Sequence, residues 1–266
     1  MPATGAPTGQ AGAARPARAV VRHDLALADL RAALVAGWQD YRAHPAFGMF
    51  FGGIYVVSGW FLTWVTVARG EVVWLVPAAA GFPLLAPFCA VGLYEVSRRR
   101  AAGLPLRWGP VLGAVRGRGD EQILSMGVIL FVAFGFWVMI AHGIFAVFLA
   151  QSGIGSESLA LFHTTAGQIM LLFGGGVGAG IALAFYTITV ISLPMLVDRD
   201  VDFLTAIATS MNSVLANRLV MLTWAAVIAI GLTAAMLPGF LGLLIVLPVL
   251  GHATWHLYRR ALILPA

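Results

Sequence analysis

Long apolar runs are the feature of this sequence that most limits its fold. Several approach or exceed the ~20 residues that an α-helix needs to cross the hydrocarbon core of a bilayer. Apolar residues make up 60% of the 266 residues and charged residues only 10%, against roughly 45–50% and about 25% in a soluble domain. We place membrane spans at residues 47–67, 72–94, 123–150, 167–197, 219–237 and 240–257. The sequence therefore predicts an all-α, polytopic membrane protein with six transmembrane helices.

The amino-terminal segment has a different composition from the rest of the chain. Residues 1–20 are rich in Ala, Gly and Pro and lack the continuous apolar stretch of roughly 7–15 residues that a secretory signal peptide contains. We expect a disordered cytoplasmic tail there, followed by a six-span membrane domain at residues 21–266. The lone Cys89 excludes an intramolecular disulfide.

The basic residues are distributed unevenly between the links that join the predicted spans. All 16 are arginines, and only Arg69 lies in a link that follows the first, third or fifth span. Loops rich in Lys and Arg stay on the cytoplasmic side of a membrane, so the sequence predicts that both termini are cytoplasmic. The arginines are separated by apolar runs and do not form one patch, so the net charge of +5 does not indicate a nucleic-acid partner.

Short amphipathic segments precede the odd-numbered spans and suggest an internal repeat. Their apolar faces are Leu30, Leu34, Trp38 and Tyr41 in the first, Trp108, Val111, Leu112 and Val115 in the second, and Phe203, Ile207, Met211 and Val214 in the third. Such helices lie in the membrane interface or pack beneath a bundle. Pro87 and Pro248, in even-numbered spans, are each followed at the same offsets by an aromatic residue and two arginines. We interpret the chain as three repeats of an interfacial helix plus a helical hairpin, with chance similarity among apolar helices as the alternative.

One polar stretch after the fourth span carries a family resemblance. Residues 192–202, SLPMLVDRDVD, are followed by a short predicted helix and Asn217-Arg218. This pattern resembles domain-of-unknown-function family 2189, a family of predicted bacterial integral membrane proteins, and the similarity extends from about residue 24 to residue 260. The resemblance implies the six-span architecture and a bacterial inner membrane. It implies no activity, because none is assigned to the family.

Ionisable residues at membrane depth usually mark ion pathways, proton relays and substrate sites. None of the predicted spans has Asp, Glu, Lys or Arg in its interior. Glu95 comes closest, at the end of the second span and three residues before Arg98, a spacing that favours a local ion pair. A carrier driven by protons or sodium normally needs an intramembrane carboxylate, so the sequence disfavours secondary active transport.

Histidines are the remaining candidate ligands. His252 and His256 are four residues apart on the sixth span, so they share one helix face and could bind a metal or contribute to a haem site. His142 and His163 lie toward the opposite membrane surface and cannot join them. We interpret His252 and His256 as structural, hydrogen-bonded residues, and we expect no cofactor and no metal site.

Glycines cluster in the fourth span, where Gly174, Gly176, Gly178 and Gly180 form small-xxx-small pairs. Such pairs let membrane helices approach closely. We predict a packing surface there, within the bundle or between copies of the chain, and a hinge is the alternative.

These observations favour a non-enzymatic inner-membrane protein that acts as an accessory, lipid-interacting or assembly factor. Its expected partners are membrane lipids, with another membrane protein or a second copy as further candidates, and Arg107, Arg116 and Arg118 are the candidate lipid contacts.

Two other functions remain as alternatives. The first is a channel or facilitator for a small solute, with a pore lined by polar residues of the fourth span, namely Gln168, Thr187, Thr189 and Ser192. The second is a haem or metal redox protein that uses His252 and His256.

Overall fold

Long helices form the body of the protein. The computed structural model describes residues 19–71, 74–75, 86–116, 122–152 and 159–263. Four stretches of this part of the chain are long and apolar enough to cross a membrane: Pro45–Ala68, Gln122–Ala150, Thr165–Asp198 and Arg218–Met236. They correspond to helices α2 (Pro45–Ala68), α6 (Gln122–Ser152), α7 (Thr165–Thr189) with α8 (Ser192–Asp198), and α10 (Arg218–Met236). The prediction of an all-α membrane protein is confirmed, with four of the predicted spans among these candidates.

The second and sixth predicted spans are not among these four candidates. Much of the second, at residues 72–94, lies outside the described residues, and only its end is seen in α4 (Ala86–Ala101). The sixth corresponds to α11 (Leu243–Ala261), whose second half carries His252, His256, Arg259 and Arg260. Those polar residues keep α11 out of the set of candidate spans.

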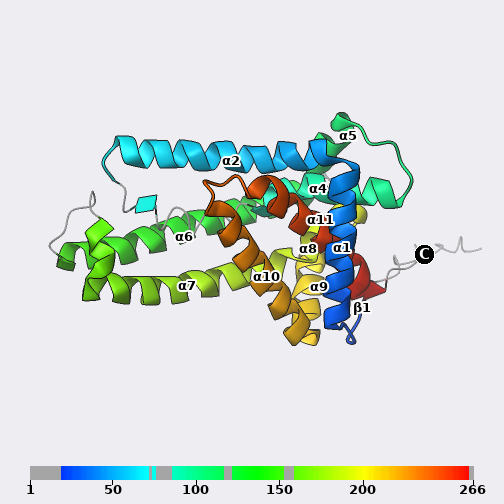
Figure 1. The fold of residues 1–266 in the computed structure, drawn as a ribbon. Coiled ribbons are helices and arrows are strands. Elements are labelled where there is room, and N and C mark those ends of the chain that lie inside the picture. Colours follow the sequence, from blue (N-terminus) through cyan, green and yellow to red (C-terminus); the bar gives the residue numbers. More distant parts are fainter. Residues whose placement is uncertain (1–18, 72–73, 76–85, 117–121, 153–158, 264–266) are drawn as a thin grey trace, which may run out of the picture.

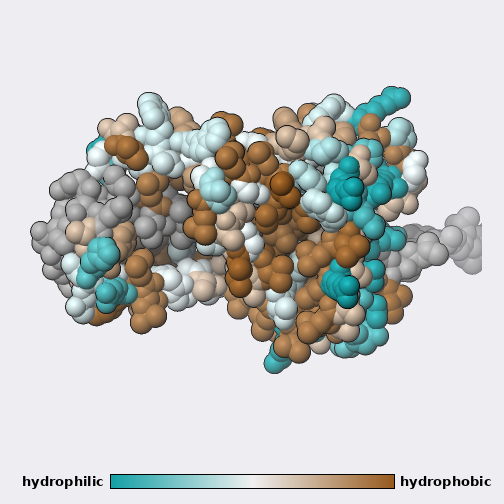
Figure 2. Space-filling model, in the orientation of Figure 1, coloured by the Kyte–Doolittle hydropathy of each residue, from teal (hydrophilic) through white to brown (hydrophobic). Residues whose placement is uncertain are grey.

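Short helices gather at one end of the bundle. They are α1 (Leu27–Ala43), α5 (Trp108–Leu112) with the 3-10 turn Gly113–Arg116, α8, and α9 (Phe203–Ala216). In Figure 1 they lie on the right, while α2, α6 and α7 extend to the left and a 3-10 turn at Leu159–His163 precedes α7. Hydrophilic residues concentrate at the same right-hand end and apolar ones cover the middle (Figure 2). We call this the basic end, because the arginines of α1, α4 and α11 lie there.

Both ends of the described chain meet at the basic end. The two-residue strand β1 (Val20–Val21) pairs antiparallel with β2 (Leu262–Ile263), and Arg22 N donates to Ala261 O at 2.9 Å. This pairing places the start and the finish of the described chain next to each other at one end of the bundle.

The predicted interfacial segments are helical, but the faces predicted for them need correction. In α1 the buried stripe is Leu30, Ala33, Gly37 and Asp40, whereas Trp38 is 43% exposed. In α9 the buried residues include Ser210 and Val214, while Met211 points outward. In α5, Val111 is buried but Trp108 and Leu112 are exposed. Apolar side chains at these surfaces can face lipid, so hydrophobicity alone did not identify the inward face.

Helix α11 is the centre of packing at the basic end, where it lies against α1, α2 and α4. Two glycines bring backbones into direct contact. A Cβ on Gly37 would lie 2.6 Å from the backbone N of Ala253, and one on Gly52 would lie 2.8 Å from the carbonyl O of Leu243. Glycine at these positions therefore permits a helix spacing that any side chain would prevent.

The turn between α10 and α11 does not reach as far as the end of α2. Trp60 Nε1 donates to the carbonyl O of Gly239 at 2.8 Å, and α2 continues for eight residues beyond Trp60, or about 12 Å at ~1.5 Å per residue. In Figure 1, α10 and α11 likewise meet part of the way along α2. The hairpin is thus shorter than the α6–α7 pair.

The close approach of α2 and α11 gives a testable prediction about adjacent glycines. Changing Gly52 to Ala should force α2 and α11 apart and destabilise the fold by about 1–3 kcal/mol, the usual cost of overpacking. Gly53→Ala is the matched control, because nothing lies within 4 Å of a Cβ at that position. The apparent melting temperature in detergent should fall for the first variant only. Equal melting temperatures would show that α11 is free to shift.

Candidate functional site

A buried cluster of polar side chains joins three helices at the basic end. Asp40 of α1 accepts hydrogen bonds from Ser97 Oγ of α4 (2.6 Å) and from His256 Nε2 of α11 (2.8 Å), and it also pairs with Arg100. His252 Nδ1 lies 2.8 Å from Ser97 Oγ. We call these five residues the Asp40 cluster. Its members come from segments up to 216 residues apart in the chain, so only the folded structure assembles it.

The carboxylate of Asp40 is the charge on which the cluster is centred. Asp40 as a whole is only 3% exposed. Burial alone would raise the pKa of Asp40, but the hydrogen bonds from His256, Ser97 and Arg100 outweigh burial and lower the pKa to about 2. Asp40 is therefore ionised at neutral pH and neutralised within the protein by Arg100.

The hydrogen bonds also indicate the tautomer of His252. Because Ser97 donates its proton to the ionised Asp40, Ser97 Oγ must accept from the Nδ1–H of His252. The Nε2 atom is then a lone-pair acceptor, and it has no hydrogen-bond partner among the described residues. A neutral, fully buried imidazole in this position fits a structural role.

Serine, histidine and aspartate together also occur in hydrolases, but this arrangement differs from a catalytic triad. In a triad the histidine lies between the serine and the carboxylate and accepts the proton of the serine. Here Ser97 lies between Asp40 and His252, donates to the carboxylate, and is 1% exposed. The hydroxyl of Ser97 is thus engaged and closed to a substrate in this structure.

The histidines predicted as weak metal candidates both belong to the Asp40 cluster. Within the described chain, no group of three or more His, Cys, Asp or Glu side chains is placed to hold a metal ion. His142 lies elsewhere, where its Nδ1 is 2.8 Å from Val138 O and its ring stacks on Trp74 at 4.6 Å. His163 is exposed at the end of the 3-10 turn Leu159–His163. The structure therefore keeps these two histidines apart from His252 and His256, as expected.

Ion pairs surround the Asp40 cluster. Glu95 accepts two hydrogen bonds of 2.7 Å from Arg98, which confirms the local pair predicted from their spacing. Asp198, in the stretch that carries the family resemblance, accepts from Tyr258 (2.9 Å) and Arg259 (3.1 Å) of α11. These contacts tie α8 to α11.

Asn217, the residue before α10, forms hydrogen bonds with the segment that precedes α1. Its Oδ1 accepts from Leu25 N at 3.2 Å, and its Nδ2 donates to Arg22 O at 2.6 Å. In the Asn217-Arg218 pair of the family resemblance, Asn217 therefore has a structural role, whereas Arg218 is exposed.

The four glycines of the predicted packing surface on α7 differ in how closely other helices of the chain approach them. A Cβ on Gly178 would lie 2.9 Å from the ring of Trp137 on α6, and one on Gly174 would make ordinary contact with Ile144 at 3.5 Å. A Cβ on Gly176 or Gly180 would meet nothing within 4 Å. Among these four glycines, only Gly178 is so close to another helix of the same chain that a Cβ would force a shift.

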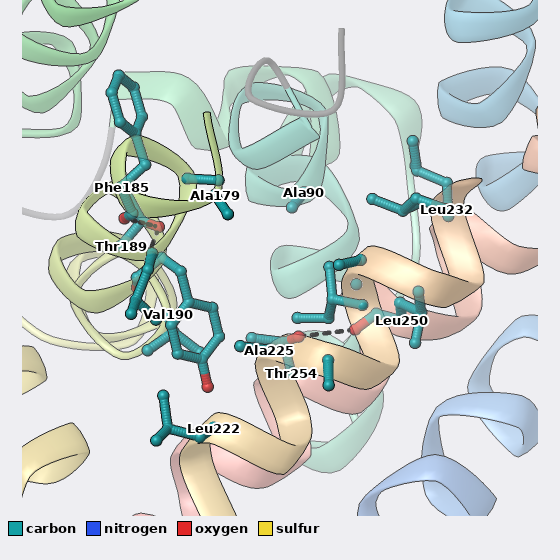
Figure 3. A pocket seen from close by; sticks show the side chains of 18 of the residues that line it. Ala90, Ala179, Phe185, Thr189, Val190, Leu222, Ala225, Leu232, Leu250 and Thr254 are labelled. Atoms are coloured by element: carbon teal, nitrogen blue, oxygen red, sulfur yellow. Dashed lines mark hydrogen bonds between the residues drawn. The ribbon is translucent and has the colours of Figure 1, made fainter. Parts of the chain in front are cut away.

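An apolar pocket of about 440 Å³ opens beside these elements. Figure 3 shows side chains of α7 on one side of it, those of α10 and α11 on the other, and Ala90 of α4 behind. We call it the α7–α10 pocket. Its walls are mainly small and aliphatic side chains, among them Ala179, Ala182, Ala225, Ala229, Leu232 and Leu250.

Three of the residues that line the α7–α10 pocket have hydroxyl groups bonded to backbone carbonyls. Thr189 Oγ1 donates to Phe185 O (2.7 Å) and Thr254 Oγ1 to Leu250 O (2.8 Å), as Figure 3 shows. Tyr186 Oη of α7 donates to Met221 O of α10 at 2.6 Å. The pocket thus offers apolar contact and suits an apolar chain.

A second hollow continues along α7. It has a volume of about 280 Å³, lies between α6 and α7, and shares Ala179 and Ala182 with the α7–α10 pocket. Gly174 and Gly178 line it. Part of the predicted glycine surface therefore borders a groove instead of a tight helix contact.

The polar residues proposed to line a pore are not gathered around one passage. Gln168 is exposed near the start of α7, Thr187 is half-buried near its end, and Thr189 and Ser192 are buried. The hydroxyls of Thr187, Thr189 and Ser192 each donate to the carbonyl four residues earlier.

Of the predicted lipid contacts, Arg107 is exposed at the start of α5. The side chain of Arg116 and all of Arg118 lie outside the described residues.

Sequence reasoning missed both the Asp40 cluster and the α7–α10 pocket. The apolar face predicted for the segment that forms α1, which is Leu30, Leu34, Trp38 and Tyr41, does not include Asp40. A weak signal for the pocket was present, since alanines recur at helical spacing at positions 179 and 182 and at 225, 226 and 229. Small residues in two apolar helices can mark either a close contact or an opening, and only the helix positions distinguish these.

The Asp40 cluster predicts a pH-dependent contribution to stability. Because folding lowers the pKa of Asp40 from 3.8 to about 2, its contribution is complete above about pH 4 and is lost as the pH falls toward 2. Asp40→Asn should lower the free energy of unfolding by about 3 kcal/mol at pH 7, since it leaves buried partners unpaired.

The control for that variant is Asp24→Asn, because Asp24 pairs with Arg22 on the surface with its side chain 74% exposed. Thermal unfolding in detergent across pH should separate Asp40→Asn from both the control and the parent, and the difference should shrink at low pH. A melting temperature that Asp40→Asn leaves unchanged would contradict the assignment.

Comparison with known proteins supports the membrane assignment. A family model described as "Predicted integral membrane protein (DUF2189)" matches residues 75–198, a shorter segment than the similarity expected from about residue 24 to residue 260. No curated protein and no solved structure shows significant similarity to the chain. The match includes α4, α6, α7 and α8. Residues 75–198 are thus similar to the DUF2189 family, as the resemblance indicated, and the chain is an integral membrane protein.

Proposed function

We propose that this protein is a non-enzymatic, lipid-interacting protein of the bacterial inner membrane that holds a lipid acyl chain in the α7–α10 pocket. The observation that carries the proposal is the pocket itself, an apolar opening of about 440 Å³ between helices long enough to span a membrane. An accessory or assembly role would follow from the bound lipid.

The chemistry of the α7–α10 pocket supports an acyl chain over a polar solute. Its hydroxyls at Thr189 and Thr254 are paired with backbone carbonyls, so a polar solute would exchange its water for unpaired apolar contact. An acyl chain leaves one apolar medium for another, so its affinity must come from packing against the walls and from its head group.

The topology we propose places the basic end in the cytoplasm. All but one of the arginines lie in segments assigned to that side, as the positive-inside rule requires. The six-span, three-repeat architecture remains our proposal. Three helical segments, α1, α5 and α9, precede α2, α6 and α10 along the chain and support it.

Single-cysteine labelling tests the orientation. In a Cys89→Ala background, Glu71→Cys should react with an impermeant thiol reagent added to intact cells, because Glu71 is exposed beyond the far end of α2. Ala102→Cys, exposed after α4 at the basic end, should react only after the membrane is opened. Labelling of Ala102→Cys in intact cells would reverse the proposed orientation.

Filling the α7–α10 pocket tests the lipid proposal. Ala225→Phe from α10, or Ala182→Phe from α7, should occupy the space and remove one copurifying lipid, as measured by native mass spectrometry. Ala234→Phe is the matched control, because Ala234 is exposed on α10 and does not line the pocket. The apparent melting temperatures should stay close to that of the parent. Equal lipid content in all three variants would refute the proposal.

A further inference from the structure

The α7–α10 pocket has one end near the basic end of the bundle. On α10 it is lined from Leu222 to Leu232, ten residues or about 15 Å along the helix axis. The hydrocarbon core of a bilayer is about 30 Å thick, so one leaflet contributes about half of that. The pocket therefore has the length of the acyl chain of one leaflet, the leaflet at the basic end.

A cation lies one helical turn beyond the pocket. Arg218 is four residues before Leu222, so the two side chains share a face of α10. Leu222 is 45% exposed, and Figure 3 shows it at the edge of the pocket. A lipid with its chain in the pocket would thus carry its head group toward Arg218.

The charge of Arg218 is not neutralised by the described protein. Arg98, Arg100, Arg259 and Arg260 each form a salt bridge with a carboxylate. No described carboxylate forms one with Arg218, whose Nε donates only to Leu215 O at 3.2 Å in the described contacts. The guanidinium is exposed and can present two further nitrogens to an anion.

The start of α10 adds positive potential at the same place. The residue before α10, Asn217, makes no side-chain cap for the helix, because its amide is bonded to Leu25 and Arg22. The first N–H groups of a helix attract anions, and this effect is strongest when no side chain caps them. Arg218 and the end of α10 thus favour the same negatively charged ligand.

We infer that the lipid in the α7–α10 pocket is an anionic phospholipid of the leaflet at the basic end, whose phosphate pairs with Arg218. This inference rests on the proposed function, since it names the head group of the lipid whose chain fills the pocket. It also separates a defined site at Arg218 from general attraction of acidic lipids to the arginines of this surface.

Titration of the delipidated, full-length protein in detergent tests the inference, with dioleoyl phosphatidylglycerol as ligand and native mass spectrometry as readout. Arg218→Gln should weaken binding about tenfold, the effect of losing one charge-assisted hydrogen bond, and Arg218→Lys should restore most of it. Arg31→Gln is the matched control, because Arg31 is exposed on α1 and has no described salt bridge. It should bind as the parent does.

The other outcomes are distinguishable. If Arg218→Gln and Arg31→Gln bind phosphatidylglycerol equally, while Ala225→Phe still abolishes binding, the head-group assignment is wrong and the chain-binding function stands. If Ala225→Phe has no effect, the proposed function itself fails. If inorganic phosphate alone displaces the lipid at equal concentration, the site belongs to a soluble anion, and the phospholipid assignment is overturned.

Discussion

The backbone of α11 lies in direct contact with α1 and α2, and the rest of the basic end depends on this contact. Gly37 and Gly52 make it possible, since a Cβ on either would overlap the backbone of α11. Asp40 is three residues after Gly37 on the same buried stripe of α1. The contact therefore brings the carboxylate to His256, and the packing of small residues determines where the charges meet.

Most of the described carboxylates at the basic end form salt bridges with arginines of the same chain. The Asp40 cluster and the pairs formed by Glu95 and Asp198 join α1, α4, α8 and α11 at the edge of the apolar region. Burying such a pair costs desolvation energy, and the attraction between the two charges offsets this cost only when their geometry is good. Arginines that lack a described carboxylate partner, such as Arg218, are then the ones whose charge is directed outward.

Small residues have opposite consequences in two parts of the bundle. On α1 and α2 glycines bring helices together, whereas on α7 and α10 alanines border a pocket of about 440 Å³. The difference comes from the path of α10, which is joined to α7 at the basic end through Tyr186 and Met221 and leans away from it beyond that point (Figure 1). The apolar lining of this pocket fits the hydrocarbon chain of a lipid, which is the ligand we propose for it.

The sequence by itself determined the fold class, most of the long helices and the Glu95–Arg98 pair, because apolar length and helical spacing are local properties. It also contained the motif Gly48-x-x-x-Gly52, of the same kind as Gly174-x-x-x-Gly178, with no means to decide which is used in a close contact between backbones. Only the tertiary structure decided that, together with the inward face of α1, the assembly of the Asp40 cluster and the α7–α10 pocket. Each of these depends on where helices distant in the chain come together, and in a membrane protein an apolar side chain can face either lipid or core.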